Sequence, residues 1–192
     1  MSKKDSTYHA FSHLEPEATV PWASTGDWRS ANGAIQHLCA LHHPSLGPVR
    51  KMVRDLKGAL ETIFPALESL CLQTCPGCRT PCCHVATVWF DFKDLIFINL
   101  VGAAIPLTQL GRKRSGPCRL CTPSGCSLPR LSRPWICTWY LCPPQKILLH
   151  EMTAEAGRRI EKALMEIKAL RNRIEDDFIR ITCGNRSFQH VQ

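Results

Sequence analysis

Hydrophobic positions recur with a helical period in three parts of the chain. A short helix is expected from Trp28 to His43, with its apolar residues on one side. A longer helix is predicted from Val49 to Leu70, where hydrophobic residues return every three or four positions, and Pro65 predicts a kink or a split within it. The strongest pattern runs from Leu148 to Cys183 and predicts one long C-terminal helix.

The middle of the chain has a different pattern. The segment Val85–Phe90 is β-branched and aromatic, which predicts a short strand or an extended segment. Asp91 is expected to cap a helix that continues to Val101 and ends before Pro106. The stretch that follows, up to Pro143-Pro144, is rich in proline and cysteine and is expected to be irregular.

Together these patterns predict a mainly α protein in which flanking helices pack around an irregular, cysteine-rich, metal-binding lobe. The predicted parts are a disordered tail over 1–26, helical segments plus the cysteine lobe over 27–145, the long helix over 146–184 on the same domain, and a tail over 185–192. The core of the lobe is expected over about residues 70–145.

Neither a membrane span nor a secretory signal is expected. The longest apolar run, Leu95–Leu107, has 13 residues, fewer than a bilayer-spanning helix needs. The start of the chain is polar and lacks the apolar stretch of a signal peptide. We therefore expect a cytoplasmic protein with no membrane partner.

Cysteine content changes this picture most, because the chain has 12 cysteines in 192 residues. Dense cysteines in a reducing compartment are typical of metal ligands rather than disulfides. Cys39 and Cys183 stand apart on predicted helices, where buried free thiols are expected. The other ten lie close together: Cys71, Cys75, Cys78, Cys82, Cys83, Cys118, Cys121, Cys126, Cys137 and Cys142.

The spacing of these cysteines suits tetrahedral thiolate coordination, in which the sulfurs lie about 3.7 Å apart. Two intervening residues form a turn that reaches this separation, and Cys75-Pro-Gly-Cys78 and Cys118-Arg-Leu-Cys121 are both of this kind. The number of thiols allows either one or two sites with four ligands each. Zinc and an iron–sulfur cluster both remain open as the cofactor.

The cysteines also form an ordered series of short motifs: Cys75-x2-Cys78-x3-Cys82-Cys83, then Gly116-Pro117-Cys118, Gly125-Cys126-Ser127-Leu128, Arg133-Pro134-x2-Cys137 and Tyr140-Leu141-Cys142. Over about residues 70–145 this series resembles the YkgJ-type cysteine-cluster family, a zinc- or iron-chelating domain widespread in bacteria. The family usually has two residues, not three, before its Cys-Cys pair. The resemblance implies metal-ligand roles for Cys75, Cys78, Cys82, Cys83, Cys118, Cys126, Cys137 and Cys142.

Several neighbouring residues have two interpretations each. Cys71 and Cys121 are extra to the family pattern and are either spare ligands or apolar packing. Arg133 either donates N–H bonds around the metal cofactor or is a turn residue before Pro134. His84 is an alternative ligand beside Cys83.

Charge suggests a second function. The net charge is +8, and the 56 residues between Asp94 and Glu151 contain seven Lys or Arg and no acid. Such a basic stretch, over 112–146, offsets the negative charge of thiolate sites or binds nucleic acid as a zinc-stabilised module. Nucleic acid is therefore an alternative partner to the metal ion or cluster.

No catalytic residue is predicted, since no motif of a hydrolase, nucleotide-binding enzyme or metalloprotease is present. A metal-dependent oxidoreductase or a methylase-related enzyme is the third alternative. It is considered because flagellin lysine N-methylases have a similar cysteine cluster.

Overall fold

The structure is a computed structural model that describes residues 20–184, except 80, 111–117, 123–124 and 153. This part of the chain is mainly helical, which confirms the predicted fold class at that level. The predicted tails lie largely or wholly outside it, over residues 1–19 and 185–192. In order, the elements are α1 Thr25–Leu41, α2 Gly47–Thr74, α3 Cys82–Val85, α4 Phe92–Val101, β1 Cys121–Thr122, β2 Gly125–Cys126, the 3-10 helix η1 Arg130–Ser132, α5 Ile136–Trp139, α6 Pro143–Glu151 and α7 Ala154–Cys183.

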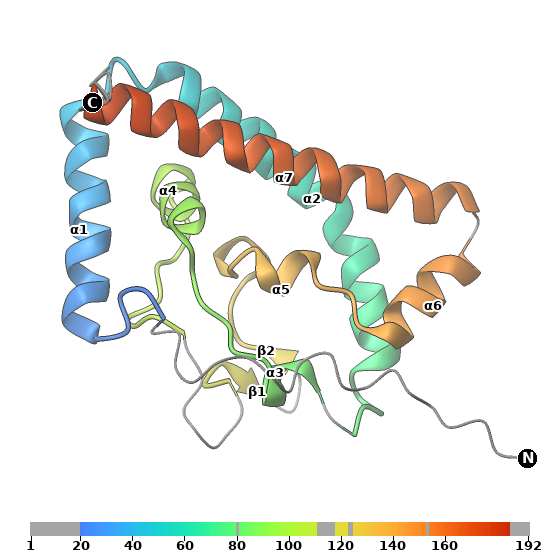
Figure 1. Ribbon diagram of the computed structural model, residues 1–192. Helices are drawn as coiled ribbons and strands as arrows, with labels where there is room; N and C mark the ends of the chain where they lie inside the picture. The colour runs from blue at the N-terminus through green and yellow to red at the C-terminus, as the bar shows by residue number, and fades with distance from the viewer. Residues whose placement is uncertain (1–19, 80, 111–117, 123–124, 153, 185–192) are drawn as a thin grey trace, which may run out of the picture.

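Helices α1, α2, α4 and α7 form what we call the helical frame. The two long helices, α2 and α7, lie side by side, and α1 and α4 pack beneath one end of them (Figure 1). Each long helix buries the apolar stripe that its period predicts, since burial of such a stripe stabilises the pair. The buried positions are Val53, Leu56, Leu60, Ile63 and Leu67 on α2 and Ile160, Ile167, Ile174 and Phe178 on α7.

Helix α4 is the most enclosed element of the frame. Leu95, Ile96 and Ile98 are almost completely buried among α1, α2 and α7. The helix begins with the predicted cap, because Asp91 accepts the N–H of Asp94 and the Asp94 carboxylate accepts the N–H of Asp91. It ends at Gly102, whose φ of 70° is the left-handed conformation that glycine adopts easily.

We use the name cysteine lobe for the described residues within the ranges 75–91 and 118–142. It contains α3, β1, β2, η1 and α5, all of them short, joined by irregular chain (Figure 1). The two strands pair antiparallel, with Cys121 opposite Cys126. Residues 86–90 are extended but join no strand; instead, the buried Gln109 amide accepts the N–H of Phe90 and donates to its carbonyl.

The prediction of one continuous C-terminal helix from Leu148 to Cys183 was wrong. The C-terminal helix is divided into α6 and α7, and α6 starts at Pro143, because proline is favoured in the first helical turn. The chain folds back tightly there: a side chain at Gly157 would come within 2.9 Å of the Leu149 carbonyl. Helix α2 continues through Pro65 as one element and changes direction along its length, which agrees with the first of the two predicted outcomes, a kink rather than a split (Figure 1).

In the part of the chain that the structure describes, no helix is both long enough and apolar enough to cross a bilayer.

Candidate metal centre

The two cysteine-bearing segments of the lobe meet at the backbone. Helix α3 contains Cys82 and Cys83, and the Cys83 carbonyl accepts the N–H of Cys118 at 2.6 Å. Cys118 is followed by a turn in which the Cys121 N–H donates to the Cys118 carbonyl. Cysteines that are far apart in the sequence therefore lie next to each other in the fold.

Arg133 stabilises the hairpin that carries Cys121 and Cys126. Its guanidinium group donates to the carbonyls of Leu128 at 2.9 Å and Cys126 at 3.3 Å. These bonds fix the position of Cys126 through its backbone. The side chain therefore contacts carbonyl oxygens of the hairpin, and its predicted role at a cofactor stays a prediction.

Helix α5, which carries Cys137, is attached to the helical frame by a buried ion pair. The Trp135 N–H, just before α5, donates to the Asp94 carboxylate at 3.0 Å. The same carboxylate pairs with Arg171 of α7 at 2.9 Å, and Arg171 also reaches Asp91 at 3.0 Å and stacks over the Trp135 ring. Burial raises the pKa of Asp94 to about 6, an effect that Arg171 opposes.

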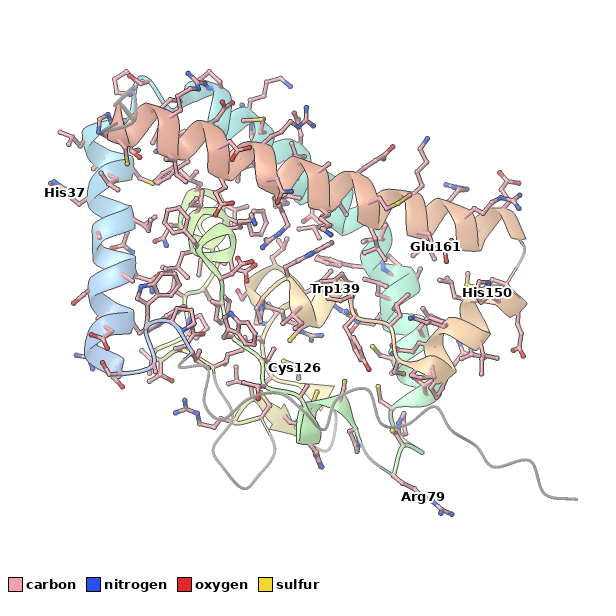
Figure 2. All side chains as sticks on the ribbon, in the orientation of Figure 1. His37, Arg79, Cys126, Trp139, His150 and Glu161 are labelled. Atoms are coloured by element: carbon pink, nitrogen blue, oxygen red, sulfur yellow. The ribbon has the colours of Figure 1, made fainter. Side chains whose placement is uncertain are left out.

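Six thiols gather where these segments converge, and we call them the central thiol cluster: Cys82, Cys83, Cys118, Cys121, Cys126 and Cys137. Figure 2 shows Cys126 at the base of the molecule near α3 and β2, with other sulfur atoms around it. The Cys83 thiol donates a hydrogen bond to Cys82, which lowers the pKa of Cys82 to about 6 and raises that of Cys83.

Ionised thiols of the cluster repel one another, and this repulsion raises the pKa values of Cys83 and Cys137. Cys137 is exposed as a residue, yet enough protein surrounds its thiol that burial raises its pKa to about 12, with contributions from Cys126, Cys118 and Cys82. Cys121 and Cys137 likewise add to the raised pKa of Cys83. The thiols are thus close enough that ionising one makes it harder to ionise the next.

Three other thiols lie at helix ends, and we call them the helix-end group: Cys71, Cys75 and Cys142. Burial raises the pKa of Cys75 to about 11, and the neighbouring Cys71 adds to the effect. Cys71 accepts from Arg130 Nη2 at 3.8 Å and from Gln145 Nε2 at 3.5 Å. Cys142 caps α6.

Arg130 and Gln145 contact a thiol, which was not predicted from the sequence. Gln145 stands three residues after Cys142, in the position of a capping box, and this spacing was the available signal. Arg130 had no such signal, because its contact with Cys71 joins residues 59 positions apart.

The remaining candidates lie away from these groups or face solvent. Cys78 and His84 are exposed, and the Cys78 N–H donates to the Cys75 carbonyl at 3.2 Å. Cys39 is buried as predicted, but Cys183, at the end of α7, is exposed, so that prediction was wrong.

All twelve cysteines are free thiols. Among the described residues, no three His, Cys, Asp or Glu side chains are already arranged to hold a metal ion. Metal binding therefore requires the thiols to lose their protons and move closer together.

A groove of about 400 Å³ lies beside the lobe, lined in part by Trp135, Trp139 and Lys168. The described residues that line it include no cysteine. A molecule bound in this groove would thus contact aromatic and charged side chains rather than a thiol.

Comparisons with protein-family models, with curated proteins and with solved structures find no match to this chain. The resemblance to the YkgJ-type family therefore stays a prediction that rests on the cysteine motifs.

Proposed function

We propose that this protein binds zinc or an iron–sulfur cluster through thiolates of the central thiol cluster. The observation that carries the proposal is the convergence of two distant cysteine-bearing segments, joined by the 2.6 Å bond between Cys118 and Cys83. Five of the residues implied by the family resemblance belong to this cluster: Cys82, Cys83, Cys118, Cys126 and Cys137. Cys121 lies among them as an additional donor.

The donor set fits a soft metal centre. Thiolates are the preferred ligands of zinc and of iron–sulfur clusters, whereas magnesium and calcium prefer oxygen. Repulsion between neighbouring thiolates opposes the ionisation of several thiols at once. A bound cation would favour their ionisation because its positive charge compensates the charge of the thiolates. Arg133, bonded to the Cys126 carbonyl, adds positive charge beside the cluster.

A cytoplasmic location is part of the proposal. Clustered free thiols persist in a reducing compartment, where metal binding competes with no disulfide. The metal would then serve a structural or a redox role in the lobe.

Contacts of the basic stretch weigh against the nucleic-acid alternative. Arg119 donates to the Gln109 carbonyl, Arg130 pairs with Glu68, and Arg133 bonds to two carbonyls. These arginines are engaged within the protein rather than displayed toward phosphates. Residues 112–114, which hold the other clustered charges of this stretch, lie outside the described residues.

Metal analysis tests the proposal directly. Protein purified without oxygen is expected to contain zinc, or iron with sulfide, at one or more equivalents per chain by mass spectrometry. Visible absorbance separates an iron–sulfur cluster from colourless zinc. Cys137→Ser is expected to lower the metal content, whereas Cys183→Ser, at an exposed helix end, is the matched control. A wild-type chain without metal, or equal metal in both variants, contradicts the proposal.

A further inference from the structure

The end of α2 presents two thiols on one side of the helix. Cys71 and Cys75 are four residues apart, so their side chains are neighbours on the helix surface, and a hydrogen bond joins their thiols. The chain then turns, and the Cys78 N–H donates to the Cys75 carbonyl at 3.2 Å. Cys78 thereby follows Cys75 with the two-residue spacing that suits a shared metal.

Helix α6 brings a further thiol to this end of α2. The Gln145 side chain is 6% exposed and bridges the two helices: it accepts the Cys142 N–H at 3.2 Å and donates to the Cys71 sulfur at 3.5 Å. The Cys142 sulfur accepts the backbone N–H of Gln145 at the start of α6. The Cys142 sulfur is thereby held at the first turn of α6, on the side of Gln145.

Arg130 places positive charge at the same point. Its guanidinium group pairs with Glu68 at 3.1 Å and also donates to the Cys71 sulfur at 3.8 Å. Its side chain is 12% exposed. Two N–H donors are therefore directed at the Cys71 sulfur, as expected for a metal-ligand sulfur rather than for apolar packing.

We infer that Cys71, Cys75, Cys78 and Cys142 form a second metal site, separate from the central thiol cluster, that binds a soft divalent cation of the zinc class. Arg130 and Gln145 donate N–H bonds to its Cys71 ligand, as surrounding residues do at metal sites. The inference rests on the proposed function for the class of metal, but on different ligands. It assigns a role to Cys71, which is extra to the family pattern.

The two sets of thiols make different contacts. The pKa of Cys83 is raised by Cys82, Cys121 and Cys137, and the pKa of Cys137 by Cys126, Cys118 and Cys82. Among the thiols, Cys71 has the largest effect on the pKa of Cys75. Cys82 of the central thiol cluster has the smallest effect on the pKa of Cys75. Cys71 and Cys75 therefore lie closer to each other than to the central thiol cluster, and Gln145 connects Cys71 to Cys142.

Binding requires a small local rearrangement. The cation replaces the thiol protons, which pass to solvent, and the sulfurs close to a separation of about 3.7 Å. The hydrogen bond between Cys75 and Cys71 is lost in this step. Cys75 and Cys78 are exposed, so their side chains are free to turn toward Cys71 and Cys142.

Zinc stoichiometry of the full-length chain tests the inference. The wild-type protein, reconstituted with zinc alone, is expected to bind two equivalents. Cys71→Ser and Cys75→Ser are each expected to bind one, and Cys137→Ser is expected to lose the other. Cys183→Ser is expected to retain both. Undiminished zinc in Cys71→Ser overturns the second site, whereas a wild type that contains neither zinc nor iron overturns the proposed function itself.

A measurement on the wild type avoids the risk that a serine variant fails to fold. Zinc is expected to protect Cys71, Cys75 and Cys142 from alkylation, and a chelator is expected to restore their labelling, as mapped by peptide mass spectrometry. Equal labelling of Cys71 with and without zinc overturns the second site. Protection of Cys137 in the same sample reports on the central thiol cluster separately.

Discussion

The helical frame and the cysteine lobe are built on different principles. The frame consists of long helices whose apolar stripes are buried, with Leu95, Ile167 and Phe178 almost inaccessible to solvent. The lobe has two-residue strands and four-residue helices, and most of its cysteines are half-buried or exposed. Apolar burial accounts for the stability of the frame, while the lobe lacks an apolar core of comparable size.

The difference indicates what each region needs in order to fold. Isolated helices and strands of a few residues are unstable in water unless other contacts hold them. In the lobe those contacts are backbone hydrogen bonds, the bonds of Arg133 and the contacts of Trp135 with Asp94 and Arg171 of the frame. A metal bound by thiolates from both segments would add the cross-link that the lobe otherwise lacks.

Metal removal is expected to have the largest effect on stability, and to affect the lobe much more than the frame. A structural zinc site contributes about 10–16 kcal/mol to folding, comparable to the net stability of a whole domain. A chelator should therefore remove hydrogen-exchange protection from the lobe while α2 and α7 remain protected. Far-ultraviolet circular dichroism should fall only slightly, since the long helices persist.

The matched comparison is the same protein after zinc is returned, which should restore protection in the lobe. Loss of protection throughout the frame, or unchanged protection in the lobe, would break the division between the regions.

The ion pair between Asp94 and Arg171 lies within the frame at the point where Trp135 of the lobe contacts both residues, and breaking it should have the next largest effect. Both side chains are about 5% exposed, so removing one partner leaves the other charge buried. Arg171→Met is expected to destabilise the protein by about 3–5 kcal/mol, measured by urea unfolding. Protection of Trp135 and α5 should fall more than protection of α2, because the Trp135 N–H donates to Asp94.

A surface ion pair of α7 gives the control for this variant. Arg180 pairs with Asp177 at 2.7 Å, but the arginine is 58% exposed. Arg180→Met is expected to cost less than about 1 kcal/mol. Equal effects of the two substitutions would show that α5 does not depend on the buried pair.

The contrast between the frame and the lobe also explains which structural elements could be predicted from the sequence. The period of apolar residues predicted α1, α2 and α7, and Asp91 predicted the start of α4, because these signals are local. The break between α6 and α7 depends on the close approach of Gly157 to Leu149, which a linear pattern does not show.

For the candidate site, the sequence predicted which cysteines gather but not how they divide. Their spacing alone predicts that Cys75 lies near Cys78 and Cys118 near Cys121. The pairing of Cys121 with Cys126 and the hydrogen bond between Cys118 and Cys83 depend on the fold. Arg130 and Gln145 approach Cys71 across long sequence separations, so their contacts could not be predicted from spacing.

The smallest expected effect is a difference in reactivity between two thiols, Cys82 in the lobe and Cys39 in the frame. Hydrogen bonding from Cys83 lowers the pKa of Cys82 in the lobe to about 6 from an ordinary value of 9.0, while burial raises the pKa of Cys39 in the frame. In metal-free protein at pH 7, Cys82 should thus be a thiolate and Cys39 a thiol. Alkylation mapped by mass spectrometry should label Cys82 first.

The pH dependence has a definite sign. Because the pKa of Cys82 is lowered, its thiolate is present above pH 6 and is lost as the pH falls through about 6, so its labelling should slow there. The part of the folding stability that this thiolate provides is complete above pH 9.0 and is lost progressively as the pH falls from 9.0 to about 6. Cys83→Ala removes the donor and should move the midpoint toward 9.0, whereas Cys183→Ala should leave it unchanged. Equal labelling of Cys82 and Cys39 at pH 7, or a midpoint that Cys83→Ala does not move, would show that the lobe does not prepare a thiolate before metal arrives.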